Sequence, residues 1–275
     1  MSSISAKRST FRRLHEMGCF VLPNPWDVGS ARMLESLGFK ALATSSAGLA
    51  WSRGRADGAL TREQVLAHMK ELVSASALPV NADFESGFGI DPQGVAESVR
   101  LAIDTGVAGL SIEDASGDPA QPILALDTAV ERLRAARAAI DQSGGETLLV
   151  GRAENFFLGR PDLPDTLARL EAYAEAGADC LYAPGIRTRE QIRAVVATVA
   201  PKPVNVLIGW PSELTLDELG ALGVRRVSVG GALARAAWGG LLRAATSLAA
   251  GRFDGFEGAA SGAELNALFA QRPPK

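Results

Sequence analysis

Short apolar runs recur along the whole chain, and each is followed by a longer segment with helical spacing of its apolar residues. The eight runs occupy residues 19–23, 41–44, 79–83, 109–113, 147–152, 179–183, 203–207 and 226–229. Continuous apolar runs of this length are typical of strands that are buried on both faces of a parallel sheet. The pattern therefore predicts eight buried strands.

Helix signals stand between the predicted strands. Thr61 with Gln64 three residues later forms a capping-box pattern, Asp91 precedes Pro92 at a helix start, and Gly106 stands at a helix end. We expect helices over residues 28–37, 61–77, 91–105, 127–142, 163–176, 216–222 and 233–249, and one that begins after residue 188. Shorter helices are expected at 4–17 and 263–270.

Two longer segments break this alternation on the side where strands end. Residues 45–48 are small and predict a turn, and residues 49–60 predict a loop shaped for a ligand, in which Trp51, Arg53 and Arg55 could close over a substrate. Residues 115–125 contain two prolines and predict another loop. His68, within a predicted helix, is expected on the surface.

Eight strand-then-helix units in about 250 residues predict an α/β protein with a single (β/α)₈ barrel. We assign residues 1–275 to one barrel domain, with an N-terminal helix in 1–18 and a C-terminal extension in 251–275. A doubly wound sheet with a large cap is the alternative. No predicted strand is followed by the G-x-G-x-x-G pattern that such a sheet uses to bind dinucleotides.

Composition narrows the class of protein. The chain has 275 residues, of which 47% are hydrophobic and 21% charged, and its net charge is −3. This charge gives no electrostatic reason to expect a nucleic acid or an acidic membrane as partner. No apolar run approaches the roughly 18–20 residues that span a bilayer, and the first nine residues lack the apolar core of a signal peptide. Because Cys19 and Cys180 both lie in apolar runs, we expect buried thiols and a cytoplasmic enzyme.

Candidate chemistry begins where the third strand ends. Asp83 and Glu85 are two residues apart, so both side chains project to one side of an extended backbone. Neighbouring carboxylates repel each other unless a cation, a proton or a basic group lies between them, and Mg²⁺ prefers such oxygen ligands. The alternative is a strand end that carries two solvated acids.

The active sites of (β/α)₈ barrels lie at the carboxyl ends of the strands. That rule gathers the polar residues that end, follow or lie in the predicted strands, namely Ser45, Ser46, Asp57, Asp83, Glu85, Glu113, Asp114, Arg152 and Asn205. Several carboxylates that face an arginine at one pole suit a metal ion together with a bound oxyacid.

These residues also carry a resemblance to a known family. Residues 83–89, Asp-Phe-Glu-Ser-Gly-Phe-Gly, resemble the D-x-D-x-G-[FY]-G segment of the isocitrate lyase/phosphoenolpyruvate mutase superfamily. Supporting matches lie at residues 24–27, 44–48, 111–114 and 151–154, and the resemblance extends over residues 20–245. It implies a (β/α)₈ barrel whose eighth helix is swapped onto a neighbouring subunit, in a dimer or a dimer of dimers.

The resemblance also implies a cofactor and ligands. It assigns Mg²⁺, with Mn²⁺ as a substitute, to Asp83 and Glu85, while Glu113 and Asp57 act directly or through waters. Glu85 stands where relatives carry a shorter Asp, so the cation should lie further from that strand. Arg152 would act in binding and catalysis. The resemblance implies a 2-oxo acid or related small carboxylate as substrate.

Most of the remaining substrate contacts are predicted from the same resemblance. The backbone of Ser45, Ser46 and Ala47 would receive the substrate carboxylate together with Arg152. Asn205 is predicted to contact the substrate from its place in the seventh strand. Arg235 matches a substrate arginine of the methylisocitrate branch; the alternative is a charge on a helix surface.

Departures from the family pattern limit the reaction. Residues 115–122 lack the K-[KR]-C-G-H loop of isocitrate and methylisocitrate lyases, and they also lack the asparagine of the phosphonate enzymes. Gly185 replaces a lyase glutamate, and Gly231 replaces the histidine of the oxaloacetate decarboxylase branch. The metal and enolate half of the site thus remains, and the proton donor is not identified.

We therefore predict a Mg²⁺-dependent, lyase-type enzyme that passes through an enolate-like intermediate, with C–C cleavage favoured. The alternatives are a phosphonate hydrolase or mutase, an oxaloacetate-type decarboxylase, and a catalytically silent protein that binds 2-oxo acids.

Overall fold

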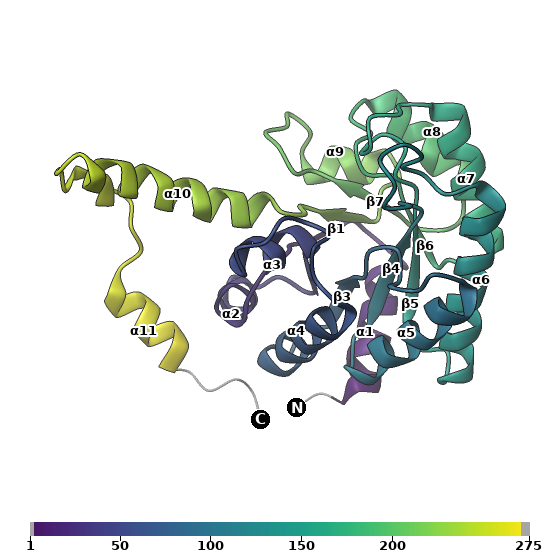
Figure 1. The fold of residues 1–275 in the computed structure, drawn as a ribbon, viewed down its shortest axis with the longest axis horizontal. Coiled ribbons are helices and arrows are strands. Elements are labelled where there is room, and N and C mark those ends of the chain that lie inside the picture. Colours follow the sequence, from purple (N-terminus) through teal and green to yellow (C-terminus); the bar gives the residue numbers. More distant parts are fainter. Residues whose placement is uncertain (1–2, 271–275) are drawn as a thin grey trace.

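The computed structural model describes residues 3–270, and the ends of the predicted terminal segments, 1–2 and 271–275, lie outside the described residues. All strands are parallel and follow the order β1-β8-β7-β6-β5-β4-β3-β2 (Figure 1). Their bounds are β1 Phe20–Leu22, β2 Leu42–Ala43, β3 Val80–Asp83, β4 Gly109–Glu113, β5 Leu148–Arg152, β6 Cys180–Tyr182, β7 Val204–Leu207 and β8 Arg226–Ser228. The predicted (β/α)₈ barrel and its eight strands are confirmed.

Asn24 helps to link β1 and β2, the two strands at the ends of this order, which are not paired with each other in the sheet. Ala43 N donates to Pro23 O at 3.0 Å, and Asn24 Nδ2 donates to Thr44 O at 2.8 Å, so the end of β1 is joined to β2. Asn24 Oδ1 in turn accepts from Val229 N at 3.0 Å and from the next backbone amide at 2.9 Å, just after β8. One buried amide therefore ties together three strand ends at the carboxyl side of the barrel.

Helices alternate with the strands and cover the outside of the barrel (Figure 1). Their bounds are α1 Ile4–Leu14, α2 Val28–Ser36, α3 Ser46–Ser52, α4 Arg62–Ala75, α5 Pro92–Asp104, α6 Leu126–Gln142, α7 Leu163–Glu175, α8 Arg189–Val199, α9 Leu216–Ala221, α10 Ala232–Ala249 and α11 Gly262–Ala270, with a 3₁₀ turn at Asp254–Phe256. The capping box at the start of α4 forms as predicted, because Thr61 and Gln64 each bond the other's backbone amide.

The prediction of a turn and loop over residues 45–60 is wrong in its first half, which forms α3. Ser45 is the N-cap of this helix, and its Oγ accepts from Gly48 N at 3.1 Å. Gly48 is also required by packing, since a Cβ there would lie 2.9 Å from Trp26 Cβ. The small residues that suggest a turn therefore allow a short helix to pack closely against its neighbours.

Helix α1 closes the amino end of the barrel. Phe11 is fully buried against Leu22 and Leu148. Lys7 Nζ donates to Val73 O at 3.0 Å, and Arg8 Nη2 donates to Ile103 O at 2.9 Å. These carbonyls belong to the last turns of α4 and α5, so the basic side chains of α1 cap the carboxyl ends of two barrel helices.

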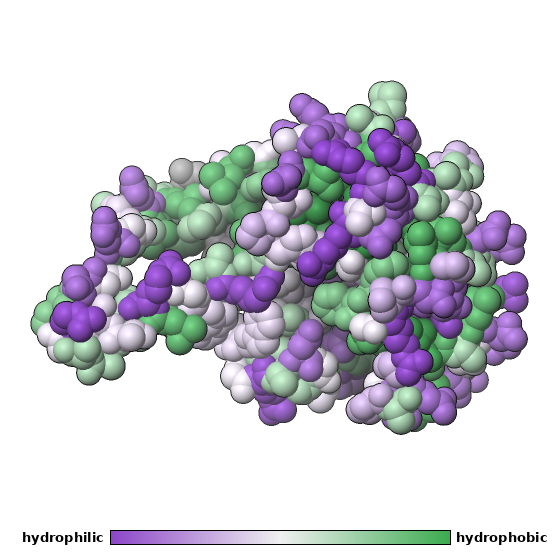
Figure 2. All heavy atoms as spheres, turned by 90° about the horizontal axis from the view of Figure 1, so that it is seen from above, coloured by the Kyte–Doolittle hydropathy of each residue, from purple (hydrophilic) through white to green (hydrophobic). Residues whose placement is uncertain are grey.

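The last two helices form an arm that extends from the barrel (Figure 1). Apolar side chains remain exposed along it, as the green atoms on that side of Figure 2 show. The exposed residues are Trp238, Leu241, Leu242, Leu248, Phe253, Phe256 and Phe269. Helix α11 returns towards α2, where the Arg32 guanidinium lies 5.5 Å from the centre of the Phe269 ring. Among residues 3–270, no helix is long and apolar enough to cross a membrane.

His68 is buried in α4 with 3% of its surface exposed, so the prediction of a surface position is wrong. Its Nε2 has no hydrogen-bond partner. Burial, followed by the charge of Arg53, lowers the pKa of His68 to about 4, and Asp27 opposes the shift. The folded protein therefore holds this imidazole neutral at pH values where the unfolded chain would bind a proton.

We expect His68→Leu to change the pH dependence of stability. The folded pKa lies below the unfolded value of 6.5, so this histidine costs stability as the pH falls from 6.5 towards 4. Relative to the parent protein, the variant should gain about 2 kcal/mol in the free energy of unfolding between pH 7.5 and pH 5. Urea unfolding at both pH values measures this gain. Parallel pH profiles for the two proteins would contradict it.

Candidate active site

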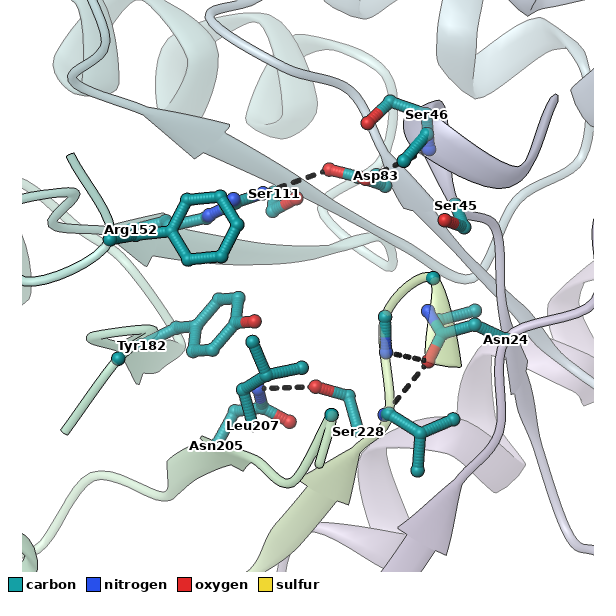
Figure 3. Close-up of a pocket in the computed structure, with 18 of the residues that line it drawn as sticks. Asn24, Ser45, Ser46, Asp83, Ser111, Arg152, Tyr182, Asn205, Leu207 and Ser228 are labelled. Carbon is teal, nitrogen blue, oxygen red and sulfur yellow. Dashed lines mark hydrogen bonds and ion pairs between the residues drawn. The ribbon is translucent and has the colours of Figure 1, made fainter. Parts of the chain in front are cut away.

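A cavity of about 660 Å³ opens at the carboxyl ends of the strands and runs into the barrel (Figure 3). The predicted residues that line it are Ser45, Ser46, Ala47, Asp57, Asp83, Arg152, Asn205 and Arg235. Glu85 and Glu113 are not among its lining residues. Cavities of roughly 300–1,000 Å³ hold drug-sized ligands, so this one has space for more than a three-carbon acid.

Asp83 is fixed by two hydrogen bonds to the segment that starts α3. Its backbone N donates to Thr44 Oγ1 at 2.8 Å, and its Oδ2 accepts from Ser46 N at 3.0 Å. The end of β3 is thereby joined to the end of β2. The second carboxylate oxygen, Oδ1, points towards β5 (Figure 3).

Arg152 occupies the centre of the acidic group. Its Nη1 lies 3.0 Å from Asp83 Oδ1 and 2.9 Å from Glu113 Oε2, and its Nε donates to Glu154 Oε1. The rings of Tyr182 and Phe157 lie 5.3 Å and 5.9 Å from the guanidinium carbon. Three ion pairs and two aromatic faces therefore hold the guanidinium plane in one orientation.

A second buried network supports this arrangement from behind. Asp114 Oδ1 accepts from Glu154 N at 2.8 Å, while Oδ2 accepts from the Tyr173 hydroxyl at 2.6 Å and from Arg169 Nη1 at 3.1 Å. Glu154, Tyr173 and Arg169 were not predicted to have a role. Two signals pointed to Glu154, namely its place in the family match over residues 151–154 and its position two residues beyond Arg152.

The carboxylates at this pole carry more negative charge than one arginine can balance. Burial raises the pKa of Glu113 well above its usual value, with Glu154 adding to the shift and Arg152 opposing it. Burial likewise raises the pKa of Glu154. Burial and then the charges of Asp83 and Asp57 raise the pKa of Glu85 to about 7. The pole therefore favours binding of protons or of further positive charge.

This excess of negative charge is what a bound metal cation would balance. The donors are carboxylate oxygens, which suit a hard divalent cation such as Mg²⁺. No group of three His, Cys, Asp or Glu side chains within residues 3–270 is already arranged to hold a metal ion, because the Arg152 guanidinium lies between Asp83 and Glu113. The residue types and their charge fit the cation, while its ligand set is not preformed.

The other predicted residues take distinct positions. Glu85 has a backbone φ of +48°, which is strained for a residue other than glycine. Asp57 lies on the loop after α3, where partial burial and then the charge of Asp83 raise its pKa, and a hydrogen bond with Ser46 opposes the shift. Asn205 is fully buried and bonds Ser228, and Arg235 Nη2 donates to Gly209 O.

Several cavity residues were not predicted to bind a ligand. They are Phe156, Phe157, Tyr182, Arg187, Trp210 and Arg226. The Arg187 guanidinium lies 4.2 Å from the centre of the Trp210 ring at the rim. Trp51, which was predicted to close over the substrate, also lines the cavity. Residues 115–125 contribute nothing to the cavity wall and are held as a small hairpin by a bridge between Ala115 and Ile123.

Fold and site together define a class: a (β/α)₈ barrel enzyme with a polar site, rich in acids around one arginine, at the carboxyl ends of its strands. Residues 11–249 match the family model of phosphoenolpyruvate phosphomutase. The chain belongs to this family, within the phosphoenolpyruvate mutase/isocitrate lyase superfamily. The predicted resemblance is confirmed.

Individual relatives support the same class. A Burkholderia cenocepacia J2315 protein, provisionally described as a lyase/mutase, is 50% identical, with a TM-score of 0.95 and 98% of each chain covered. The structure of 2,3-dimethylmalate lyase is 27% identical, with a TM-score of 0.85 and 98% and 95% coverage. An oxaloacetate decarboxylase from Bradyrhizobium sp. (strain ORS 278) is 32% identical over 212 residues, or 74% of this chain and 70% of that protein. The prediction of a lyase-type enzyme agrees with these relatives.

We expect Tyr173→Phe to destabilise the protein, because it removes a hydrogen bond to the buried Asp114 carboxylate. Loss of one such bond should lower the free energy of unfolding by about 1–3 kcal/mol. Asp114→Asn should cost more, because it leaves the Arg169 guanidinium without its buried acid. Thr246→Val, which removes an exposed hydroxyl from α10, is the control. Urea unfolding measures these changes. If Tyr173→Phe had the same free energy of unfolding as the parent protein, a structural role for this network would be contradicted.

Proposed function

We propose that this protein is a Mg²⁺-dependent carbon–carbon lyase that acts on a small 2-oxo acid or on its aldol or Claisen adduct. One observation carries the proposal: Asp83, Glu113 and Glu154 surround Arg152 beside the first turn of α3, at the catalytic end of a barrel. The similarity to 2,3-dimethylmalate lyase supports the same reaction class.

Each side chain then has a defined task. Asp83 and Glu85 would hold the cation, and Glu113 and Asp57 would act on it directly or through waters. When bound, Mg²⁺ supplies a Lewis acid that stabilises negative charge on the substrate's keto oxygen. The substrate carboxylate lies at the backbone of Ser46 and Ala47.

Arg152 has the second task, on the substrate. Its guanidinium donates to substrate oxygens and stabilises the charge that develops as the C–C bond breaks and an enolate forms. The ion pairs to Glu113 and Glu154 position it, and the neighbouring rings limit the access of water.

Decarboxylation of a 2-oxo diacid is the second candidate. The Bradyrhizobium relative carries that activity in its name, and C–C cleavage to CO₂ passes through the same enolate. The glycine at position 231, where the resemblance places a histidine in that branch, favours the lyase. A protein that binds 2-oxo acids without turnover is the remaining possibility, and the experiment below separates it.

We also propose a cytoplasmic location and a homo-oligomer with a swapped C-terminal helix. Cys19 and Cys180 form no disulfide, as a reducing compartment requires. The exposed apolar residues of α10 would be covered by a second copy of this chain, in which the arm lies against the neighbouring barrel.

We expect Asp83→Asn to lower metal-dependent turnover strongly. Oxaloacetate, 2,3-dimethylmalate, methylisocitrate, isocitrate and phosphonopyruvate form the substrate panel, assayed with Mg²⁺ and with Mn²⁺. The substitution removes a charged ligand of the cation that stabilises the developing negative charge, so kcat/KM should fall by about 10²–10³-fold. Asp118→Asn, on the exposed hairpin after β4, should keep parental activity.

The same substrate panel distinguishes the proposed lyase from an enzyme that cleaves a P–C bond and from a protein that binds without turnover. Release of phosphate from phosphonopyruvate would replace the lyase with a P–C bond enzyme. Metal-dependent binding by calorimetry, with no product from any member, would identify a silent binding protein. Equal turnover by Asp83→Asn and the parent would exclude the proposed metal site.

We expect Leu241→Glu combined with Leu242→Glu to lower the mass of the assembly measured by light scattering. Both side chains are more than half exposed on α10, and burial of a charge at their positions would oppose association. Leu37→Glu, at an equally exposed leucine outside the arm, is the control. A parent protein that is monomeric at micromolar concentration would exclude the swapped assembly.

A further inference from the structure

Strand β8 begins with an arginine that faces the inside of the barrel. Arg226 lines the cavity although only 2% of its surface is exposed. Its Nε donates to Asn205 Oδ1 at 2.9 Å, and its Nη1 lies 3.4 Å from both Asn81 Oδ1 and His15 Nε2. Three neutral groups therefore position the guanidinium at the inner end of the cavity.

His15 accepts this contact as a neutral ring. Its Nδ1 lies 2.8 Å from Phe11 O and must donate to it, so Nε2 carries the lone pair that faces Arg226. Burial, followed by the charge of Arg226, lowers the pKa of His15 to about 3. The histidine therefore adds no charge of either sign at neutral pH.

Among residues 3–270, no other group near Arg226 supplies a negative charge. Burial raises the pKa of the Cys180 thiol, and it raises the pKa of Tyr182 to about 12, so both stay protonated. Arg226 forms no ion pair with a carboxylate anywhere in residues 3–270. Burial lowers the pKa of Arg226, but an arginine side chain remains a cation in proteins.

A buried cation without an anion is costly, and hydrogen bonds to neutral groups offset only part of that cost. Nε and Nη1 of Arg226 have protein partners, but no acceptor within residues 3–270 is bonded to Nη2. Some nitrogen and oxygen atoms without a partner are fully enclosed by the protein, but Nη2 is not among them. The Arg226 side chain borders the cavity. This nitrogen is the donor available to a ligand that enters from the mouth.

The cavity itself leads from one arginine to the other. Arg152 borders the part at the strand ends, and the inner end is bordered by uncharged polar groups, among them Asn81, Ser111 and Ser228. Ser228 Oγ accepts from Asn205 Nδ2 at 2.9 Å and also bonds the side chain of Tyr182, so this hydroxyl is part of the uncharged lining of the cavity. Uncharged donors around a lone guanidinium are suited to a carboxylate-sized anion.

We propose that the inner end of the cavity is a second anion subsite, in which Arg226 binds a carboxylate. Resting on the proposed function, this assigns the substrate to the diacids: its 2-oxo acid group lies at the Arg152 end, and its distal carboxylate lies at Arg226. A free small anion from solution has the same chemistry and is the other possible occupant.

Matched acids separate these occupants from each other. Calorimetry in the presence of Mg²⁺ compares 2-oxoglutarate with 2-oxopentanoate, which have equal chain length but differ by one carboxylate. The parent protein should bind the diacid at least ~10-fold more tightly, as a charge-assisted hydrogen bond allows. Arg226→Gln should remove this preference and leave the affinity for 2-oxopentanoate within about twofold. Equal affinities in the parent, or equal losses for both acids in the variant, would overturn the diacid assignment.

A free anion is tested without any 2-oxo acid. Formate and chloride should raise the melting temperature of the parent more than that of Arg226→Gln if a small anion occupies the subsite. An identical response of the two proteins, together with no diacid preference, would exclude the subsite altogether. If neither 2-oxo acid binds but the anion response differs, the subsite stands and the proposed 2-oxo acid function fails.

A second variant, Asn205→Asp, tests the proposal even if Arg226→Gln does not fold. The new carboxylate would lie where the amide oxygen accepts from Arg226 Nε, and would supply the missing counter-charge inside the protein. We expect this variant to remain folded and to lose the diacid preference, because the subsite is then neutralised. A diacid preference retained in folded Asn205→Asp would contradict the role of Arg226.

Discussion

The guanidinium of Arg152 is buried among carboxylates, and its positive charge allows acidic side chains from three strand ends to share one pole of the barrel. Without it, Asp83 and Glu113 would face each other as uncompensated buried charges, which a protein interior tolerates poorly. The neighbouring elements are arranged to keep it in place: Tyr182 stacks beside it, and Asp114 fixes the backbone of Glu154. The catalytic end of this barrel is therefore organised by one cation.

The same cavity contains a second buried arginine with the opposite imbalance. Arg152 has more acids around it than it can neutralise, whereas Arg226 has only neutral partners. Excess negative charge thus lies near the strand ends, and excess positive charge lies deeper in the barrel. Such a separation orients any ligand that brings a cation at one end and a carboxylate at the other. The interior polar layer, with Asn81 and Asn205, replaces the branched apolar residues that usually fill a barrel.

Function here is obtained at a cost in stability. Glu85 adopts a strained backbone conformation, and the buried acids are held close enough to raise one another's pKa. The barrel compensates elsewhere with an extensive apolar layer between sheet and helices and with α1, whose basic side chains cap neighbouring helices. The apolar side chains of the arm, by contrast, remain exposed in the isolated chain.

The order of apolar runs by itself determined the eight strands, since a parallel barrel needs each strand buried on both faces and that requirement is local in sequence. Asp83 and Arg152 could also be identified, because strand ends in a barrel share one pole. Other features depended on tertiary structure. Helix α3 can pack against Trp26 because residue 48 is a glycine, and His68 is buried in the folded protein. The lack of an acidic partner for Arg226 could not be predicted from the sequence of β8, because it depends on which side chains the surrounding elements place next to the guanidinium.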